Sequence, residues 1–142
     1  MLKGIPEIIS PDLMKILMEM GHGDDLVIGD VNFPAASNAR RLVRCDGHDA
    51  PPLLDAILRF FPLDTFVEKP VTLMSVVKGT LDETPKIWEE YRRIVKQHCN
   101  SFTDFEYIDR FEFYERARTA YSIIATSERA LYGVIILKKG VF

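Results

Sequence analysis

The chain has 142 residues, a length that suits a single domain with one hydrophobic core. Hydrophobic residues make up 47% and charged residues 27%, which is the ordinary balance of a folded globular protein and excludes a disordered chain. The formal net charge of −3 provides no basic field for a phosphate backbone, so nucleic acid is not an expected partner.

The sequence contains no candidate membrane segment. No run of about 18 uncharged apolar residues occurs, and the amino terminus lacks an apolar stretch behind a basic start. The two cysteines, Cys45 and Cys99, are far apart and lack metal-ligand spacing, which suits free thiols in a reducing compartment. We therefore expect a cytoplasmic protein, with residues 1–142 forming one domain.

The first predicted helix begins at residues 10–12, Ser-Pro-Asp. A hydroxyl can cap free amides, proline suits the first turn, and an acid complements the helix dipole. Gly21 ends this helix, because glycine readily takes the left-handed conformation of a C-terminal cap. The expected buried stripe consists of Leu13, Ile16, Leu17 and Met20.

Short apolar runs and two further helices follow. Residues 26–28 and 42–45 are predicted as strands separated by a loop at 32–39, and residues 71–77 as a third strand. Residues 52–61 and 85–97 have helical periodicity. Their expected inward faces are Leu53, Leu54, Ile57 and Leu58 in the first, and Ile87, Tyr91, Ile94 and Val95 in the second.

The last third is predicted as strand 105–108, helix 111–119, strand 121–126 and strand 134–137. This alternation implies an α/β fold with a three-layer arrangement, in which helices cover both faces of a central sheet. The pattern does not determine the strand order.

His22 is the first candidate for chemistry, because it stands between Gly21 and Gly23 at a predicted helix-to-strand turn. Imidazole is suited to proton transfer near neutral pH, and the glycines allow a ligand close to the backbone. The alternative is an ordinary surface histidine. The other two histidines have no such setting: His48 is predicted in a loop, and His98 on the surface at a helix end.

Asp30 follows the first predicted strand, and open α/β sheets bind ligands beyond the carboxyl ends of their strands. Its carboxylate can accept hydrogen bonds from hydroxyl groups of a ligand or orient His22, and the alternative role is a turn cap. The other acids at turns are expected to be solvated. These are Asp24, Asp25 and Asp46.

Arg110 lies where a strand gives way to a helix, and its fork of donors suits adjacent hydroxyl groups or a structural carboxylate. Tyr132 and Gly133 offer a hydroxyl beside accessible backbone, or alternatively form a simple turn. Nearby aromatic side chains are expected mostly in the core, with at most one at a pocket. They are Phe111, Phe113, Tyr114 and Tyr121.

Three segments together resemble the L-fucose mutarotase family. They are SPDLMKILMEMGHGDDLVIGDVNFPA (10–35), RFEFYERA (110–117) and LYGVIILKKG (131–140). The resemblance runs nearly end to end and includes Leu63-Asp64-Thr65. It implies an isomerase that interconverts the anomers of L-fucose in carbohydrate metabolism, with no metal and no cofactor.

The resemblance also implies roles for individual residues. His22 matches the family's proton donor, while Asp30, Arg110, Tyr132 and Gly133 match positions that contact the sugar. Tyr132 is the second candidate for proton transfer. Val134 departs from the asparagine of many relatives, so a side-chain hydrogen bond from that position is absent here.

The family forms stacked rings of subunits with sites near subunit contacts, which implies a homo-oligomer, expected as a decamer. Two alternative functions stay open. One is a D-ribose pyranase, the related branch of the superfamily. The other is a noncatalytic sugar-binding or transport-accessory protein that keeps the pocket but transfers no proton.

Overall fold

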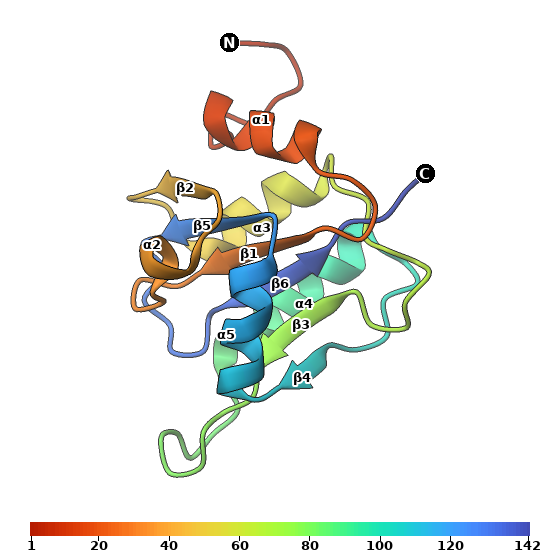
Figure 1. Cartoon of the computed structure of the whole chain (residues 1–142). Helices are drawn as coiled ribbons and strands as arrows, with labels where there is room; N and C mark the ends of the chain where they lie inside the picture. The colour runs from red at the N-terminus through yellow and green to blue at the C-terminus, as the bar shows by residue number, and fades with distance from the viewer.

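A computed structural model describes residues 1–142 and contains five helices and six strands (Figure 1). The helices are α1 (Pro11–Glu19), α2 (Ala35–Asn38), α3 (Ala50–Leu58), α4 (Lys86–His98) and α5 (Arg110–Thr119). The strands are β1 (Asp25–Gly29), β2 (Leu42–Cys45), β3 (Val71–Met74), β4 (Glu106–Ile108), β5 (Ser122–Thr126) and β6 (Ile135–Lys138).

All six strands form one mixed sheet in the order β2-β5-β1-β6-β3-β4. The central strand β6 is antiparallel to both neighbours, with Ile136 opposite Val27 of β1 and Thr72 of β3. The remaining pairs are parallel. The carboxyl ends of five strands therefore meet at one edge of the sheet, together with the start of β6. We call this the carboxyl edge, and the opposite one the amino edge.

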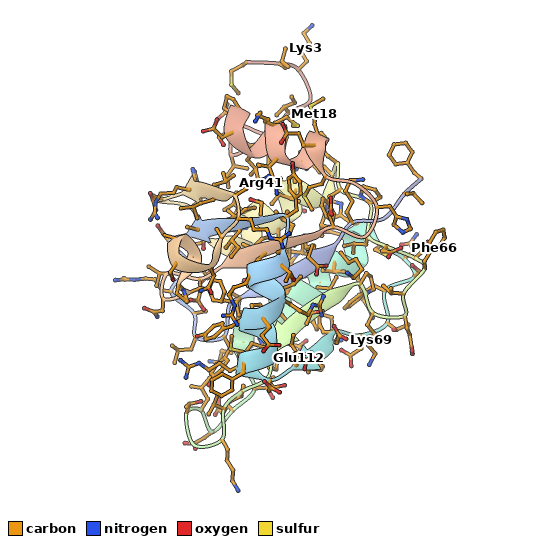
Figure 2. All side chains as sticks on the ribbon, in the orientation of Figure 1. Lys3, Met18, Arg41, Phe66, Lys69 and Glu112 are labelled. Atoms are coloured by element: carbon orange, nitrogen blue, oxygen red, sulfur yellow. The ribbon has the colours of Figure 1, made fainter.

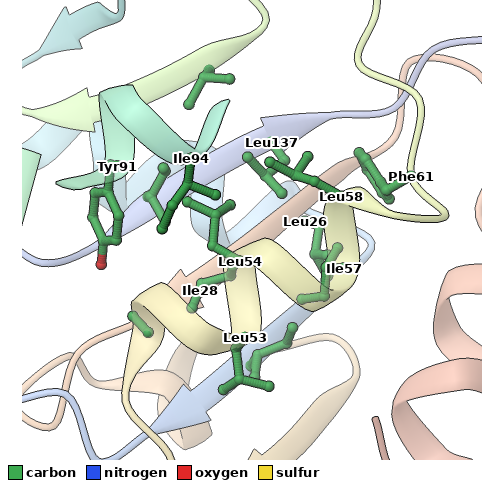
Figure 3. Close-up of a cluster of buried hydrophobic side chains, with 14 of the residues drawn as sticks. Leu26, Ile28, Leu53, Leu54, Ile57, Leu58, Phe61, Tyr91, Ile94 and Leu137 are labelled. Atoms are coloured by element: carbon green, nitrogen blue, oxygen red, sulfur yellow. The ribbon is translucent and has the colours of Figure 1, made fainter. Parts of the chain in front are cut away.

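Helices cover both faces of the sheet, as the three-layer prediction requires (Figure 1). The larger core cluster lies between the sheet and α1, α3 and α4, and the smaller one between the sheet and α2 and α5. Leu26 and Ile28 of β1 belong to the first cluster, while Val27 belongs to the second. Figure 3 shows Leu26 and Ile28 packed beside Leu53, Leu54 and Ile57 of α3.

The predicted helices and strands are confirmed, with ends that differ by at most three residues. Ser10 caps α1 by accepting from the Leu13 amide at 3.1 Å. The start of α3 lies at Ala50, because Pro51 and Pro52 both fit a first turn. The strand predicted at 71–77 is shorter and ends at Met74.

Four expectations were wrong. Gly21 does not take the left-handed conformation: Met20 caps the end of α1, and Gly23 is the glycine of this turn with a positive φ. The loop predicted at 32–39 contains the short helix α2. Phe111 was expected in the core but is 75% exposed, because it lies on the outer side of α5. Asp25 was expected to be a solvated turn residue, yet it opens β1 with only 14% of its side chain exposed and pairs with Lys138 and Arg116. None of the helices has the length and apolar character of a membrane span.

Candidate active site

The carboxyl edge of the sheet contains a cavity of about 320 Å³. Its walls come from the segments after β1 and β3, the first turns of α5, and the loop before β6. The structure brings together four of the predicted site residues here: Asp30, Arg110, Tyr132 and Val134. The remaining lining residues are Asn32, Phe33, Met74, Val77, Thr80, Tyr114 and Leu131.

Asp30 presents its carboxylate at this cavity. Its Oδ1 accepts from the backbone amide of Asn32 at 3.0 Å. Burial raises the pKa of Asp30, while the backbone amides of Asn32, Phe33 and Gly133 oppose that rise. The group is therefore a fixed acceptor in a partly desolvated place, which suits hydroxyl groups of a ligand.

Arg110 opens α5, which begins here because the Asp109 side chain accepts from the Glu112 amide at 2.9 Å. One helical turn later, the Tyr114 hydroxyl accepts from Nε of Arg110 at 3.2 Å. The guanidinium also lies 5.3 Å from the centre of the Tyr114 ring. Tyr114 thus orients the arginine, and it is the one aromatic of its group that lines the cavity.

Tyr132 has a left-handed backbone, with φ of 60°, which is a strained conformation for a residue other than glycine. Its hydroxyl accepts from the Val77 amide at 3.0 Å and pairs with the hydroxyl of Thr80. Its carbonyl accepts from Nε1 of Trp88 at 3.0 Å. The surroundings therefore fix both the backbone and the hydroxyl of Tyr132 at the cavity.

Gly133 and Val134 continue the loop into β6. The Gly133 carbonyl accepts from the buried Tyr91 hydroxyl at 2.6 Å. A Cβ on Gly133 would lie 3.0 Å from the Ala130 carbonyl oxygen, so glycine allows the tight packing here. Val134 is only 2% exposed and packs with Phe33 and Met74 in the smaller core cluster. Its side chain adds an apolar wall to the cavity.

His22 lies apart from this cavity, in the turn before β1 at the amino edge. Its Nε2 is 3.1 Å from Oδ1 of Asp64, and its ring meets Phe66 edge-on at 5.0 Å. Phe66 is labelled in Figure 2. The His22 side chain is 38% exposed, whereas that of Asp64 is 5% exposed. The buried Asp64 carboxylate thus orients the imidazole, which stays open to solvent.

Asp64, rather than Asp30, orients His22, which corrects the second role considered for Asp30. Strand β1 separates the two residues, and its five residues alone span roughly 17 Å. The Phe66 amide donates to Asp64 at 3.0 Å, and this bond together with His22 lowers the pKa of Asp64 against the effect of burial. The carboxylate therefore stays ionised beside the imidazole.

Backbone hydrogen bonds to the end of β6 hold Asp64 in position. Its amide donates to the Lys138 carbonyl at 3.0 Å, and the Gly140 amide donates to the Pro62 carbonyl at 2.7 Å. A Cβ on Gly140 would lie 2.5 Å from the Leu63 carbonyl oxygen, so only glycine permits this approach. Asp64 was not predicted as a site residue; its only signal in the sequence is its place in Leu63-Asp64-Thr65, which belongs to the family resemblance.

The other histidines are close to their predictions. His48 is an exposed loop residue, and His98 at the end of α4 pairs with Asp55 at 2.7 Å. Both cysteines are free, and burial raises the pKa of Cys45 to about 11. No group of three histidine, cysteine or acidic side chains is arranged to hold a metal ion.

The mixed sheet, with helices on both faces and a cavity lined by Asp30, Arg110 and Tyr132 at its carboxyl edge, defines an α/β protein with a candidate site for a small polar ligand. The chain belongs to the RbsD / FucU transport protein family, whose model matches residues 3–142. It is 44% identical over 146 residues to the fucose mutarotase of Homo sapiens, covering 99% of this chain and 94% of that one.

It is also 47% identical over 142 residues to the L-fucose mutarotase of Actinobacillus pleuropneumoniae, covering 99% of this chain and 97% of that one.

Solved structures are similar over the whole chain. The fucose mutarotase in complex with L-fucose from Streptococcus pneumoniae is 52% identical, with a TM-score of 0.92 and 99% coverage of both chains. FucU from Bifidobacterium longum is 50% identical, with a TM-score of 0.94 and the same coverage. Bacillus subtilis RbsD complexed with D-ribose is 21% identical, with a TM-score of 0.72, and shares the fold alone.

Proposed function

We propose that this protein is an isomerase that interconverts the α and β anomers of L-fucose. The observation that carries the proposal is its full-length similarity, at 52% identity, to a fucose mutarotase solved in complex with L-fucose. The cavity at the carboxyl edge supports it, because an acceptor (Asp30), a forked donor (Arg110) and a hydroxyl (Tyr132) converge there. These groups match the hydroxyl groups of a free sugar.

The reaction needs two proton transfers. A proton is delivered to the ring oxygen as the bond from that oxygen to the anomeric carbon breaks, and another is removed from the anomeric hydroxyl. The resulting open-chain aldehyde rotates and closes on its other face. His22 is the main proton carrier and Tyr132 its partner, while Asp30, Arg110 and Gly133 hold the sugar against Val134. Positioned acid and base groups contribute roughly 10²- to 10⁴-fold to such a step.

The active site also requires two copies of the chain. His22 lies at the amino edge and the sugar cavity at the carboxyl edge, so His22 serves the cavity of a neighbouring copy. We expect a homo-oligomer, in the form of the decamer implied by the family resemblance. Exposed apolar side chains on the amino-terminal segment and α1 support contacts between copies; they are Met1, Leu2 and Met18, the last labelled in Figure 2.

The expected location is the cytoplasm. The free thiols of Cys45 and Cys99 suit a reducing compartment, in which disulfides are rare.

Saturation-transfer NMR on free sugars tests the function. Saturating one anomer of L-fucose should reduce the signal of the other faster with micromolar protein than in buffer, and this effect should exceed any acceleration of D-ribose ring exchange. Equal or faster exchange of D-ribose would assign the protein to the ribose branch. Binding of L-fucose without faster exchange would identify a noncatalytic sugar-binding protein.

A further inference from the structure

Four charged side chains form a network at the amino edge of the sheet, on the side of α5. Nη1 of Arg116 is 2.6 Å from Glu106, and its Nη2 is 3.5 Å from Asp25. Nζ of Lys138 is 2.9 Å from the other oxygen of Asp25. The side chains of Asp25, Arg116 and Lys138 are largely buried, so each position is fixed by its partners.

Lys138 extends this network to the turn that carries His22. Its Nζ lies 3.4 Å from the Gly23 carbonyl oxygen, next to His22. Its own carbonyl accepts from the Asp64 amide at 3.0 Å. The same residue therefore contacts the backbone on both sides of the hydrogen bond between His22 and Asp64.

The backbone of Lys139 pairs with this turn, since its carbonyl accepts from the Gly23 amide and its amide donates to the Asp24 carbonyl, both at 2.8 Å. The Lys138 side chain adds the contact to the Gly23 carbonyl. His22 stands between Gly21 and Gly23, and Gly23 has a left-handed backbone with φ of +86°. Glycine leaves a backbone free to adopt many conformations. Apart from Asp64 and Phe66, His22 has no side-chain partner that would hold its ring.

Electrostatics supports the geometry. The positive charge of Lys138 is one of the smaller causes that lower the pKa of Asp64, after the Phe66 amide and His22. Lys138 thus favours the ionised carboxylate that accepts from the imidazole. Asp25 and Arg116 in turn hold the ammonium group in place.

We propose that Lys138 is a positioning residue for His22, acting through Gly23 on one side and Asp64 on the other. This inference rests on the proposed function, in which His22 carries the proton. Lys138 itself touches no part of the sugar cavity, since it lies at the opposite edge of the sheet. Its effect should therefore fall on kcat and leave sugar binding unchanged.

Three variants test this role by L-fucose anomer exchange. Lys138→Met should lower kcat by about tenfold or more, because a small displacement of a catalytic group is costly, and leave KM within about twofold. Lys138→Arg should restore most of kcat, since arginine keeps the donors and the charge. Lys139→Met is the matched control, because it removes the same charge at the next residue, whose ammonium forms its hydrogen bond with the Gly140 carbonyl and not with the His22 turn.

The imidazole signals of His22 give a second readout that does not depend on activity. The chain has three histidines, so His22→Gln assigns the ring signals directly. Lys138→Met should shift or broaden the His22 ring signals and leave those of His48 and His98 unchanged. Lys139→Met should change none of them. Should Lys138→Met fail to fold, Lys138→Gln takes its place. Its amide can still pair with Asp25, but it lacks the length and charge of the ammonium that reaches the Gly23 carbonyl, so the same shift is expected.

Wild-type kcat and unchanged His22 signals in Lys138→Met would overturn the proposal. Equal losses in Lys138→Met and Lys139→Met, or a loss confined to KM, would overturn it as well. A wild-type protein that does not accelerate anomer exchange would contradict the proposed function instead, and the ring signals would still decide whether Lys138 positions His22.

Discussion

His22 is held through one ring nitrogen, Nε2, by a carboxylate that is almost fully buried. The His22 side chain is open to solvent and is not part of the apolar core. A histidine in this setting can exchange protons with a ligand while its orientation stays fixed.

His22→Ala should therefore lower the exchange rate of L-fucose anomers by roughly 10²-fold or more, the usual contribution of a positioned acid-base group. The midpoint of thermal unfolding should change little. L-Fucose affinity should fall much less than the rate, since Asp30 and Arg110 remain. A folded His22→Ala protein with wild-type exchange, measured by saturation-transfer NMR, would remove His22 from the mechanism and leave Tyr132 as the candidate.

Replacing Asp30 by Asn should affect stability and sugar binding in opposite directions. Burial raises its pKa in the folded protein, so the stability of the fold decreases as the pH rises from the unfolded-chain pKa through the folded one. Asp30→Asn cannot ionise, so at pH 7 its free energy of unfolding should equal or exceed that of the wild type. Hydrogen bonds to charged groups contribute about 1.5–3 kcal/mol, so L-fucose affinity should fall roughly 10-fold or more.

Urea unfolding at pH 7 and sugar titration check both parts. A loss of stability with unchanged affinity would make Asp30 a turn cap, the alternative that its sequence position also allows.

Val134→Asn tests the apolar wall of the cavity. If the new amide faces the sugar, L-fucose binding should tighten or stay level, within the about 0.5–1.5 kcal/mol of a neutral hydrogen bond. A change in affinity beyond tenfold would instead indicate a rearranged loop. Because Val134 is only 2% exposed, an amide left without a partner should lower the free energy of unfolding by about 1–3 kcal/mol. Calorimetric titration and urea unfolding measure the two effects.

At the scale of elements, the residues after β6 and the segment before Asp64 are packed backbone against backbone. The Cβ of Gly140→Ala would lie 2.5 Å from the Leu63 carbonyl oxygen and 2.7 Å from Cα of Asp64. The two segments must separate, so we expect a loss of about 1–3 kcal/mol in the free energy of unfolding and slower anomer exchange.

Gly21→Ala is the control for this variant, because its Cβ would meet only Asp24 Oδ2 at 3.7 Å. It should lose less stability than Gly140→Ala in urea unfolding, although it lies closer to His22. Equal losses in both variants would contradict the packing argument.

Most elements could be predicted from local patterns, because caps and short apolar runs carry their signal within a few residues. The cap at Ser10 and the buried strand after Gly23 are examples. The strand order could not be predicted, since the insertion of β6 between β1 and β3 depends on pairing between distant segments. Exposure of Phe111 could not be predicted either, because the aromatic type alone favours burial.

Part of the candidate site could also be predicted from local patterns. The place of Asp30 followed from the rule that ligands bind beyond the carboxyl ends of strands, and the structure adds Arg110 and Tyr132 at the same edge. The hydrogen bond between Asp64 and His22 could not be inferred, because the two residues are 42 positions apart in the sequence and meet through the pairing of residues 62–64 with the end of β6. The separation of His22 from the cavity could be inferred, because His22 precedes the predicted strand at 26–28 and Asp30 follows it; this order argues against the orienting role considered for Asp30.

For the whole molecule, the positions of His22 and the cavity at opposite edges of the sheet have a direct consequence. A single copy cannot bring the imidazole to a sugar bound at Asp30 and Arg110, because β1 separates them. A complete site therefore requires His22 from one copy and the cavity from another. Closed symmetric assemblies repeat such a contact around a ring, so every site is completed in the same way.

Mixed assemblies of two impaired variants test this claim most directly. His22→Ala retains an intact cavity, whereas Arg110→Ala retains an intact His22, and each alone should exchange L-fucose anomers slowly. When the two chains are unfolded together and refolded as a mixture, about a quarter of the sites should combine an intact His22 with an intact cavity in a random assembly. Saturation-transfer NMR should then find exchange well above the mean of the separate variants. A mixture no faster than that mean would contradict a site shared between copies.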